Sequence, residues 1–118
     1  MRLRRAIANV PFMVAGSGRF DTRVMQQLGE RVCCKVGAEG VFCAALPDRG
    51  LGVAIKIDDG TARAAEVALA STIESCLPLS ALDAQALHAL SHPRLRNWND
   101  IEVGQLRPAP GLTRLRLQ

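Results

Sequence analysis

Three runs of apolar residues in the first half of the chain have the two-residue period or the short apolar length of β-strands. They cover about 31–36, 40–46 and 51–58. Glycines lie between the first two runs, and Pro47, Asp48, Arg49 and Gly50 form an ordinary turn before the third. The pattern predicts an antiparallel meander of three strands, with Lys35 near the end of the first.

The N-terminal segments have helical spacing interrupted by a loop. Residues 1–10 are expected to form a helix that Pro11 stops. A loop over PFMVAGSGRFDT follows, and a second helix is predicted at about 21–29. Asp21 or Thr22 is expected to cap this helix at its start, and Gly29 to end it.

The second half of the chain is predicted to hold two helices and a short strand. TARAAEVALASTIESCLPL has the strongest helical periodicity, and Pro78 closes it. Ser80 is expected to cap the next helix, ALDAQALHALSH. The segment after Pro93 is interpreted as a loop and a strand around Ile101–Leu106, and residues 112–118 as one more edge strand.

These elements define an α+β chain, an antiparallel sheet of about three to five strands with helices, in one domain over residues 1–118. Hydrophobic residues make up 48% of the chain but aromatic residues only 3%, so small aliphatic side chains must fill the core. No apolar run is long enough for a membrane span. The net charge of +4 comes largely from scattered arginines, which favours a solvated surface over a nucleic-acid site.

The four cysteines, Cys33, Cys34, Cys43 and Cys76, show no CxxC spacing. We therefore interpret them as buried free thiols of a protein in the reducing cytoplasm. No metal site is expected within the chain. His88 and His92 lie four residues apart, as two metal ligands would, but no third ligand is evident.

One lysine and three acidic residues are candidates for chemistry. Lys35 is either a surface lysine that closes a strand or a cation that orients a substrate carboxylate or assists proton transfer. Glu39 is a solvated turn residue or a ligand for a substrate amine. Asp58 and Asp59 are a helix cap or a carboxylate pair for acid–base work. Since neither lysine follows a serine by three residues, the chain has no Ser-x-x-Lys motif.

Four motifs in order, AGSGRFDT, CKVGAEGVF, GLGVAIKIDDGTARA and HPRLRNWNDIEVGQLRP, resemble the C-terminal part of the type II asparaginase family. This group contains the thermolabile rhizobial L-asparaginases. The resemblance implies a fold similar to serine β-lactamases and glutaminases. It also implies a serine nucleophile and a zinc-binding Cys and Lys set in segments that do not occur in these 118 residues, so no cofactor is expected within the chain.

The resemblance also assigns site residues. Lys35 is the expected catalytic residue on a strand that lines the active site, and Arg19 is an expected substrate ligand. Residues 37–40 are expected to touch substrate: Gly37, Ala38, Glu39 and Gly40. Asp21, Thr22, Lys56 and Asp59 belong to the shared motifs as structural or near-site residues.

Three functional hypotheses follow. In the first, the chain is part of an amidohydrolase that converts L-asparagine and water to L-aspartate and ammonia, and is inactive alone because the Ser-x-x-Lys motif is missing. In the second, it is a non-catalytic pseudoenzyme or assembly module that associates with itself or with a complementary N-terminal half. In the third, it is a basic nucleic-acid-binding protein.

Overall fold

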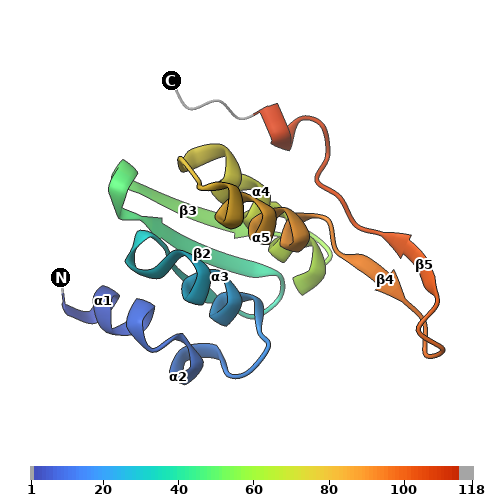
Figure 1. Ribbon diagram of the computed structural model, residues 1–118, viewed down its shortest axis with the longest axis horizontal. Coiled ribbons are helices and arrows are strands. Elements are labelled where there is room, and N and C mark those ends of the chain that lie inside the picture. The colour runs from blue at the N-terminus through green and yellow to red at the C-terminus, as the bar shows by residue number, and fades with distance from the viewer. Residues whose placement is uncertain (1, 115–118) are drawn as a thin grey trace. The chain divides into compact units, whose positions relative to one another are not determined.

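The structure is a computed structural model that describes residues 2–114. This part of the chain has α+β architecture, with a three-stranded antiparallel sheet, a two-stranded sheet and five α-helices (Figure 1). The predicted fold class is confirmed. The chain divides after Ala65 into two compact units, which are described separately.

The sheet of the first unit is the predicted meander. Strands β1 (Cys33–Val36), β2 (Val41–Leu46) and β3 (Leu51–Lys56) pair antiparallel in the order β1-β2-β3. The 3-10 turn η2 (Pro47–Arg49) connects β2 to β3, and Gly50 follows it in the left-handed conformation. Alternate residues of β2 and β3 are more and less exposed, as the period of two requires.

Three helices precede the sheet. Helix α1 (Arg2–Asn9) ends before Pro11 as predicted. The segment after it was predicted to be a loop, but Pro11–Ala15 form the short helix α2. Proline stands at the first position of this helix, where its missing N–H costs no hydrogen bond and its fixed φ suits a helix. The 3-10 turn η1 (Gly29–Arg31) joins the third helix to β1.

Helix α3 (Phe20–Leu28) begins without the predicted side-chain cap. Arg19 is the N-cap residue and makes no capping hydrogen bond with its side chain. The Asp21 carboxylate is bonded to β1, and the Thr22 hydroxyl donates to the carbonyl of Gly16 at 2.6 Å. Both side chains are therefore used in tertiary contacts. Phe20 packs edge-to-face on Phe42 of β2, with ring centroids 5.3 Å apart, so α3 lies against the inner face of the sheet.

The second unit contains two helices. Helix α4 (Ala62–Cys76) begins just before the division between the units, and Leu69 and Ile73 on its predicted apolar stripe are fully buried. Helix α5 (Ala81–Ser91) begins at the predicted cap, because the Ser80 hydroxyl accepts the N–H of Asp83 at 3.1 Å.

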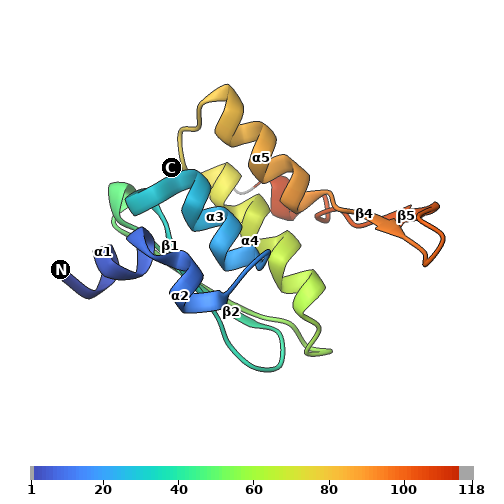
Figure 2. The same ribbon diagram turned by 60° about the horizontal axis from the view of Figure 1, so that its bottom comes forward.

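A hairpin follows α5 (Figure 2). Strand β5 (Glu102–Gln105) confirms the predicted strand, whereas β4 (Arg94–Arg96) replaces a predicted loop. The carboxamide oxygen of Asn97 accepts the N–H groups of Asn99 and Ile101, and this turn lets Arg94–Arg96 pair with β5. The edge strand predicted at the end is wrong for Leu112–Arg114, which form the 3-10 turn η3. The rest of that prediction, 115–118, lies outside the described residues.

Candidate active site

Both lysines lie on the exposed face of the three-stranded sheet. Lys35 is opposite Cys43 in the β1–β2 register, and Cys43 is opposite Ala54 in the β2–β3 register. Lys56 pairs with Val41, two residues from Cys43, and therefore projects from the same face. The side chains of Lys35, Cys43 and Lys56 are exposed.

The Lys35 ammonium is anchored at the end of β1. Its Nζ donates to the carbonyl of Val36 at 2.7 Å. An ammonium group has three donors, so this bond leaves donors for a ligand. The location of Lys35 on an exposed strand of the sheet is compatible with either of the roles considered for it.

The turn between β1 and β2 has an unusual backbone. The N–H of Gly37 donates to the carbonyl of Val41 at 2.8 Å and extends the pairing of the two strands. Glu39 then adopts a left-handed conformation with φ of 57°, which is uncommon for a residue with a side chain. Glu39 is exposed, so the turn after β1 presents an acidic side chain to solvent.

Lys56 stabilises this turn from β3. Its Nζ donates to the carbonyl of Glu39 at 2.8 Å and to the carbonyl of Ile57 at 2.6 Å. One ammonium group thus joins the β1–β2 turn to the end of β3. The structure gives Lys56 a positioning contact with the backbone of Glu39.

Close backbone packing fixes the same corner. The N–H of Ile57 donates to the carbonyl of Gly40 at 3.0 Å. A Cβ on Gly40 would lie 2.9 Å from the carbonyl carbon of Gly60, and both glycines have positive φ. Only glycine at position 40 permits this approach, because a side chain would collide with backbone. Figure 1 shows the β1–β2 turn and the segment after β3 at the same end of the sheet.

Asp59 organises the segment that leads into α4. Its Oδ1 accepts the backbone N–H of Thr61 at 2.9 Å and the Thr61 hydroxyl at 2.8 Å. These two hydrogen bonds, the backbone bond first, lower the pKa of the Asp59 carboxyl because they favour its charged form. Both bonds go to Thr61, which precedes α4, so Asp59 holds the turn ahead of the helix, whereas the predicted cap would bond N–H groups of the helix itself.

Asp21 connects α3 to β1. Its Oδ2 accepts the N–H of Val36 at 2.8 Å, and the side chain is almost completely buried, with 1% exposure. The sequence predicted a helix cap at this position and missed the bond to β1, because the contact spans 15 residues. Since Asp21 is fixed to the end of β1, the exposed Arg19 before it also lies at this end of the first unit.

The structure thus brings most of the predicted site residues to one end of the sheet, which we call the β1 corner. Its members are Asp21, Lys35, Gly37, Ala38, Glu39, Gly40, Lys56 and Asp59. Arg19 precedes α3, the helix on the inner face of the sheet, whereas Lys35 projects from the exposed face. Thr22 turns away from this corner toward Gly16 and Pro11. His88 and His92 belong to the second unit.

The cysteines differ from the uniform burial predicted for them. Cys34 and Cys76 are buried, but Cys43 is exposed and Cys33 is half-buried. None of the four is in a disulfide. The exposed face of the sheet explains the difference, because an apolar run in a strand places alternate residues on opposite faces. Cys43 is thus an addition to the β1 corner, directly opposite Lys35.

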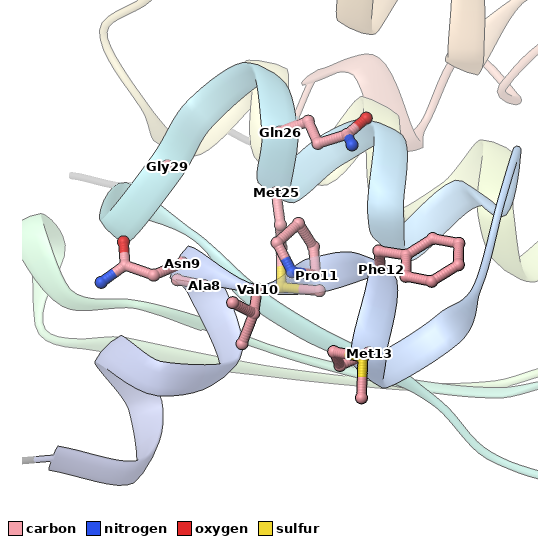
Figure 3. Close-up of a pocket in the computed structure, with 9 residues that line it drawn as sticks. All are labelled: Ala8, Asn9, Val10, Pro11, Phe12, Met13, Met25, Gln26 and Gly29. Atoms are coloured by element: carbon pink, nitrogen blue, oxygen red, sulfur yellow. The ribbon is translucent and has the colours of Figure 1, made fainter.

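A groove of about 560 Å³ lies elsewhere in the first unit, between α1, α2 and α3 (Figure 3). Met25 of α3 points toward Pro11 of α2 there, while Phe12 and Met13 are exposed at the rim. The groove contains no titratable side chain, and its full lining is Ala8, Asn9, Val10, Pro11, Phe12, Met13, Met25, Gln26 and Gly29. Hydrolysis requires acid–base groups, so the β1 corner is the better candidate for chemistry.

The family comparison agrees with the motifs. The model of the L-asparaginase II family matches residues 1–108, which include every residue of the β1 corner. The chain belongs to the L-asparaginase II family. No curated protein matches it. Among the described residues, no helix is long and apolar enough to cross a membrane.

Proposed function

We propose that the β1 corner forms one wall of the active site of an amidohydrolase that hydrolyses L-asparagine to L-aspartate and ammonia. The observation that carries the proposal is the convergence of family motifs that are distant in sequence. Asp21 bonds to Val36, and Lys56 bonds to Glu39, so three motifs meet beside Lys35. Family membership supports an asparaginase-type reaction in general.

The charges at the corner suit an amino-acid substrate. In the proposed arrangement, the ammonium of Lys35 holds the substrate carboxylate, the exposed guanidinium of Arg19 adds positive charge at this end of the first unit, and the exposed Glu39 attracts the α-amino group. Backbone N–H groups of the turn around Ala38 stabilise the oxyanion that develops when the amide carbon is attacked. The fixed left-handed backbone at Glu39 keeps these donors in place without reorganisation.

Lys35 has a second proposed role in proton transfer. A lysine accepts a proton only when its amine is neutral, and a carboxylate ligand nearby favours the charged form. We therefore propose that the first role of Lys35 is to orient the substrate carboxylate. A role in proton transfer requires the serine nucleophile to lie next to Lys35. The nucleophilic serine of a Ser-x-x-Lys motif is not among these 118 residues. We therefore propose that the chain by itself does not hydrolyse L-asparagine.

Binding tests the site separately from turnover. L-asparagine or L-aspartate added to the ¹⁵N-labelled chain is expected to shift the amide signals of residues 36–40 and of Arg19, and Lys35→Met is expected to reduce these shifts. Arg49→Met removes another exposed cation, in η2 at the other end of the sheet, and is the matched control. Shifts that Lys35→Met leaves unchanged, or that fall only on the α1–α3 groove, would refute the assignment.

Ammonia release tests the second part of the proposal. The purified chain is expected to release no ammonia from L-asparagine above the rate without protein. Asparagine-dependent release that Lys35→Ala abolishes would contradict the statement that the chain does not turn over, while it would support the location of the site. A negative binding result would therefore contradict the location of the site, whereas ammonia release would contradict only the inactivity of the chain alone.

A non-catalytic assembly module is the second candidate, and the exposed apolar rim of the groove favours it. Val10, Phe12 and Met13 are 52%, 56% and 79% exposed, and Leu3 on α1 is 82% exposed. We propose a second copy of the chain as the partner, since a two-fold contact needs only one such patch on each subunit. The nucleic-acid hypothesis has less support, because Arg5, Arg31, Arg94 and Arg96 are paired with carboxylates.

Sedimentation velocity at increasing concentration tests the assembly proposal. The chain is expected to form dimers, and Met13→Glu is expected to shift it to monomers, because a charge cannot be buried in an apolar contact without a partner. Leu82→Glu, at an exposed position of α5, is the control. A chain that stays monomeric at all concentrations, or dimers that Met13→Glu leaves intact, would rule out this face.

A further inference from the structure

Two histidines at the end of α5 form a pair that neither the family comparison nor the proposed amidohydrolase function uses. The rings of His88 and His92 stack with centroids 4.0 Å apart and planes inclined by 23°. The backbone N–H of His92 donates to the carbonyl of His88 at 2.9 Å, so the helical spacing of the pair is kept up to the last residue. Residues four apart on a helix lie on the same side, one turn above the other.

A buried hydroxyl orients one of the two rings. Ser91 is fully buried, and its Oγ lies 2.8 Å from Oε1 of Glu74 and 2.9 Å from Nδ1 of His92. It also lies 3.2 Å from the carbonyl of His88. The hydroxyl has one proton, and both the carboxylate and the carbonyl can only accept. The hydroxyl therefore donates to one of them and accepts a hydrogen bond from Nδ1–H of His92.

This arrangement fixes the tautomer of His92. With the proton on Nδ1, the neutral ring carries its lone pair on Nε2. A hydrogen-bond chain that ends on a carboxylate is the type of outer contact that orients metal-binding histidines and sets their tautomer. The chain Glu74–Ser91–His92 thus prepares Nε2 to act as a ligand.

We propose that His88 and His92 chelate one divalent transition-metal ion such as Ni²⁺, Cu²⁺ or Zn²⁺. Imidazole is a preferred ligand for these ions. The ring centroid of His88 lies 4.0 Å from that of His92, so in the proposed site His88 rotates to direct one nitrogen toward an ion on Nε2 of His92, while Ser91 keeps the His92 ring in place. The described residues contain no group of three or more His, Cys, Asp or Glu side chains suited to a metal, so water completes the coordination.

Calorimetric titration of the untagged full chain with Ni²⁺ tests the proposal. Cys43 is an exposed thiol that also binds such ions, so the experiment uses a Cys43→Ser background. One ion per chain is expected, and Cu²⁺ bound to the same protein is expected to show electron-paramagnetic-resonance couplings from two imidazole nitrogens. His88→Ala is expected to abolish the calorimetric binding and leave one coupled nitrogen.

A spacing variant is the matched control. His88→Ala combined with Gln85→His keeps two histidines in this segment, the new one at an exposed position of α5, but places them seven residues and about two turns apart. It is expected to bind no better than His88→Ala. Binding equal to that of the unaltered pair, or a copper spectrum with fewer than two coupled nitrogens, would overturn the chelate. Circular dichroism shows whether each variant keeps its helix content.

The role of Ser91 has its own readout. Ser91→Ala is expected to weaken Ni²⁺ binding by about 10- to 100-fold, the usual effect of removing an outer-shell partner. Nitrogen NMR of the metal-free chain is expected to show His92 protonated on Nδ1. An unprotonated Nδ1 there would refute the tautomer assignment even if Ser91→Ala perturbed folding.

Discussion

The carboxylate of Asp21 accepts the backbone N–H of Val36 at 2.8 Å and joins the first turn of α3 to the last residue of β1. Val36 directly follows Lys35, so this bond fixes the strand end from which Lys35 projects. The bond therefore ties the strand end to the start of α3.

Replacing Asp21 should destabilise the chain. Asp21→Ala leaves the N–H of Val36 without its partner in a part-buried position, and the unfolding free energy is expected to fall by about 1–3 kcal/mol. Urea denaturation followed by circular dichroism measures this loss. Asp48→Ala is the control, because the Arg31–Asp48 ion pair is partly exposed and such pairs contribute about 0–1 kcal/mol. Equal losses in both variants would contradict the prediction.

Gly40→Ala should cost more stability than Gly50→Ala. Both glycines have positive φ, 69° and 62°, so each alanine variant incurs about 1–2 kcal/mol of backbone strain. At Gly50 a Cβ meets no atom within 4 Å, whereas at Gly40 it would lie 2.9 Å from the carbonyl carbon of Gly60. Thermal unfolding of the two variants measures the difference. Matching melting temperatures would show that the contact between the turn and Gly60 is unimportant.

The pKa of Asp59 should depend on Thr61. The two bonds from Thr61 lower the pKa of the Asp59 carboxyl, so Thr61→Ala is expected to raise it by removing the hydroxyl bond. Carbon NMR of the side-chain carboxyl against pH measures this change. Because the folded pKa is below the unfolded one, the stabilisation is present above the unfolded pKa and lost as the pH falls through the folded value. Ser17→Ala, at an exposed loop position, should leave the Asp59 titration unchanged.

Cys34 should make the chain less stable at alkaline pH. Burial, followed by the charges of Asp21 and Cys33, raises the pKa of the Cys34 thiol from 9.0 to about 12. The folded state therefore retains a proton that the unfolded state loses. This stabilisation is complete below the unfolded pKa and declines as the pH rises from about 9 toward about 12. Urea midpoints for the unaltered chain and for Cys34→Ala should converge over this range, and a constant difference would contradict the assignment.

Thiol labelling should separate the four cysteines by exposure. At pH 8, iodoacetamide is expected to modify Cys43 first, and Cys34 and Cys76 last, because both are buried and burial also raises the pKa of the Cys34 thiol. Peptide mass spectrometry over time gives the order. Cys43→Ser should remove the fastest phase and leave the others unchanged. Rapid modification of Cys34 in the folded chain would show that β1 opens readily.

Local patterns determined the elements of this protein. The alternation of apolar and polar residues and the short apolar runs predicted the three-stranded meander. The helical spacing of apolar residues predicted α4, and the capping residue Ser80 predicted the start of α5. These signals act within a few residues, so they are readable in the chain itself. Four separated motifs also placed the chain in its family, since their order is specific even without the structure.

Tertiary structure decided what several of those residues do. Asp21 fits a helix cap by local rules, but its carboxylate bonds to a strand 15 residues away. Arg94–Arg96 become a strand only because β5 pairs with them, and Cys43 is exposed because its strand turns alternate side chains outward. The clamp from Lys56 to Glu39 and the chain from Glu74 through Ser91 to His92 also join residues 17 or more positions apart. Such long-range hydrogen bonds have no periodic signature, because they depend on how the backbone brings distant segments together.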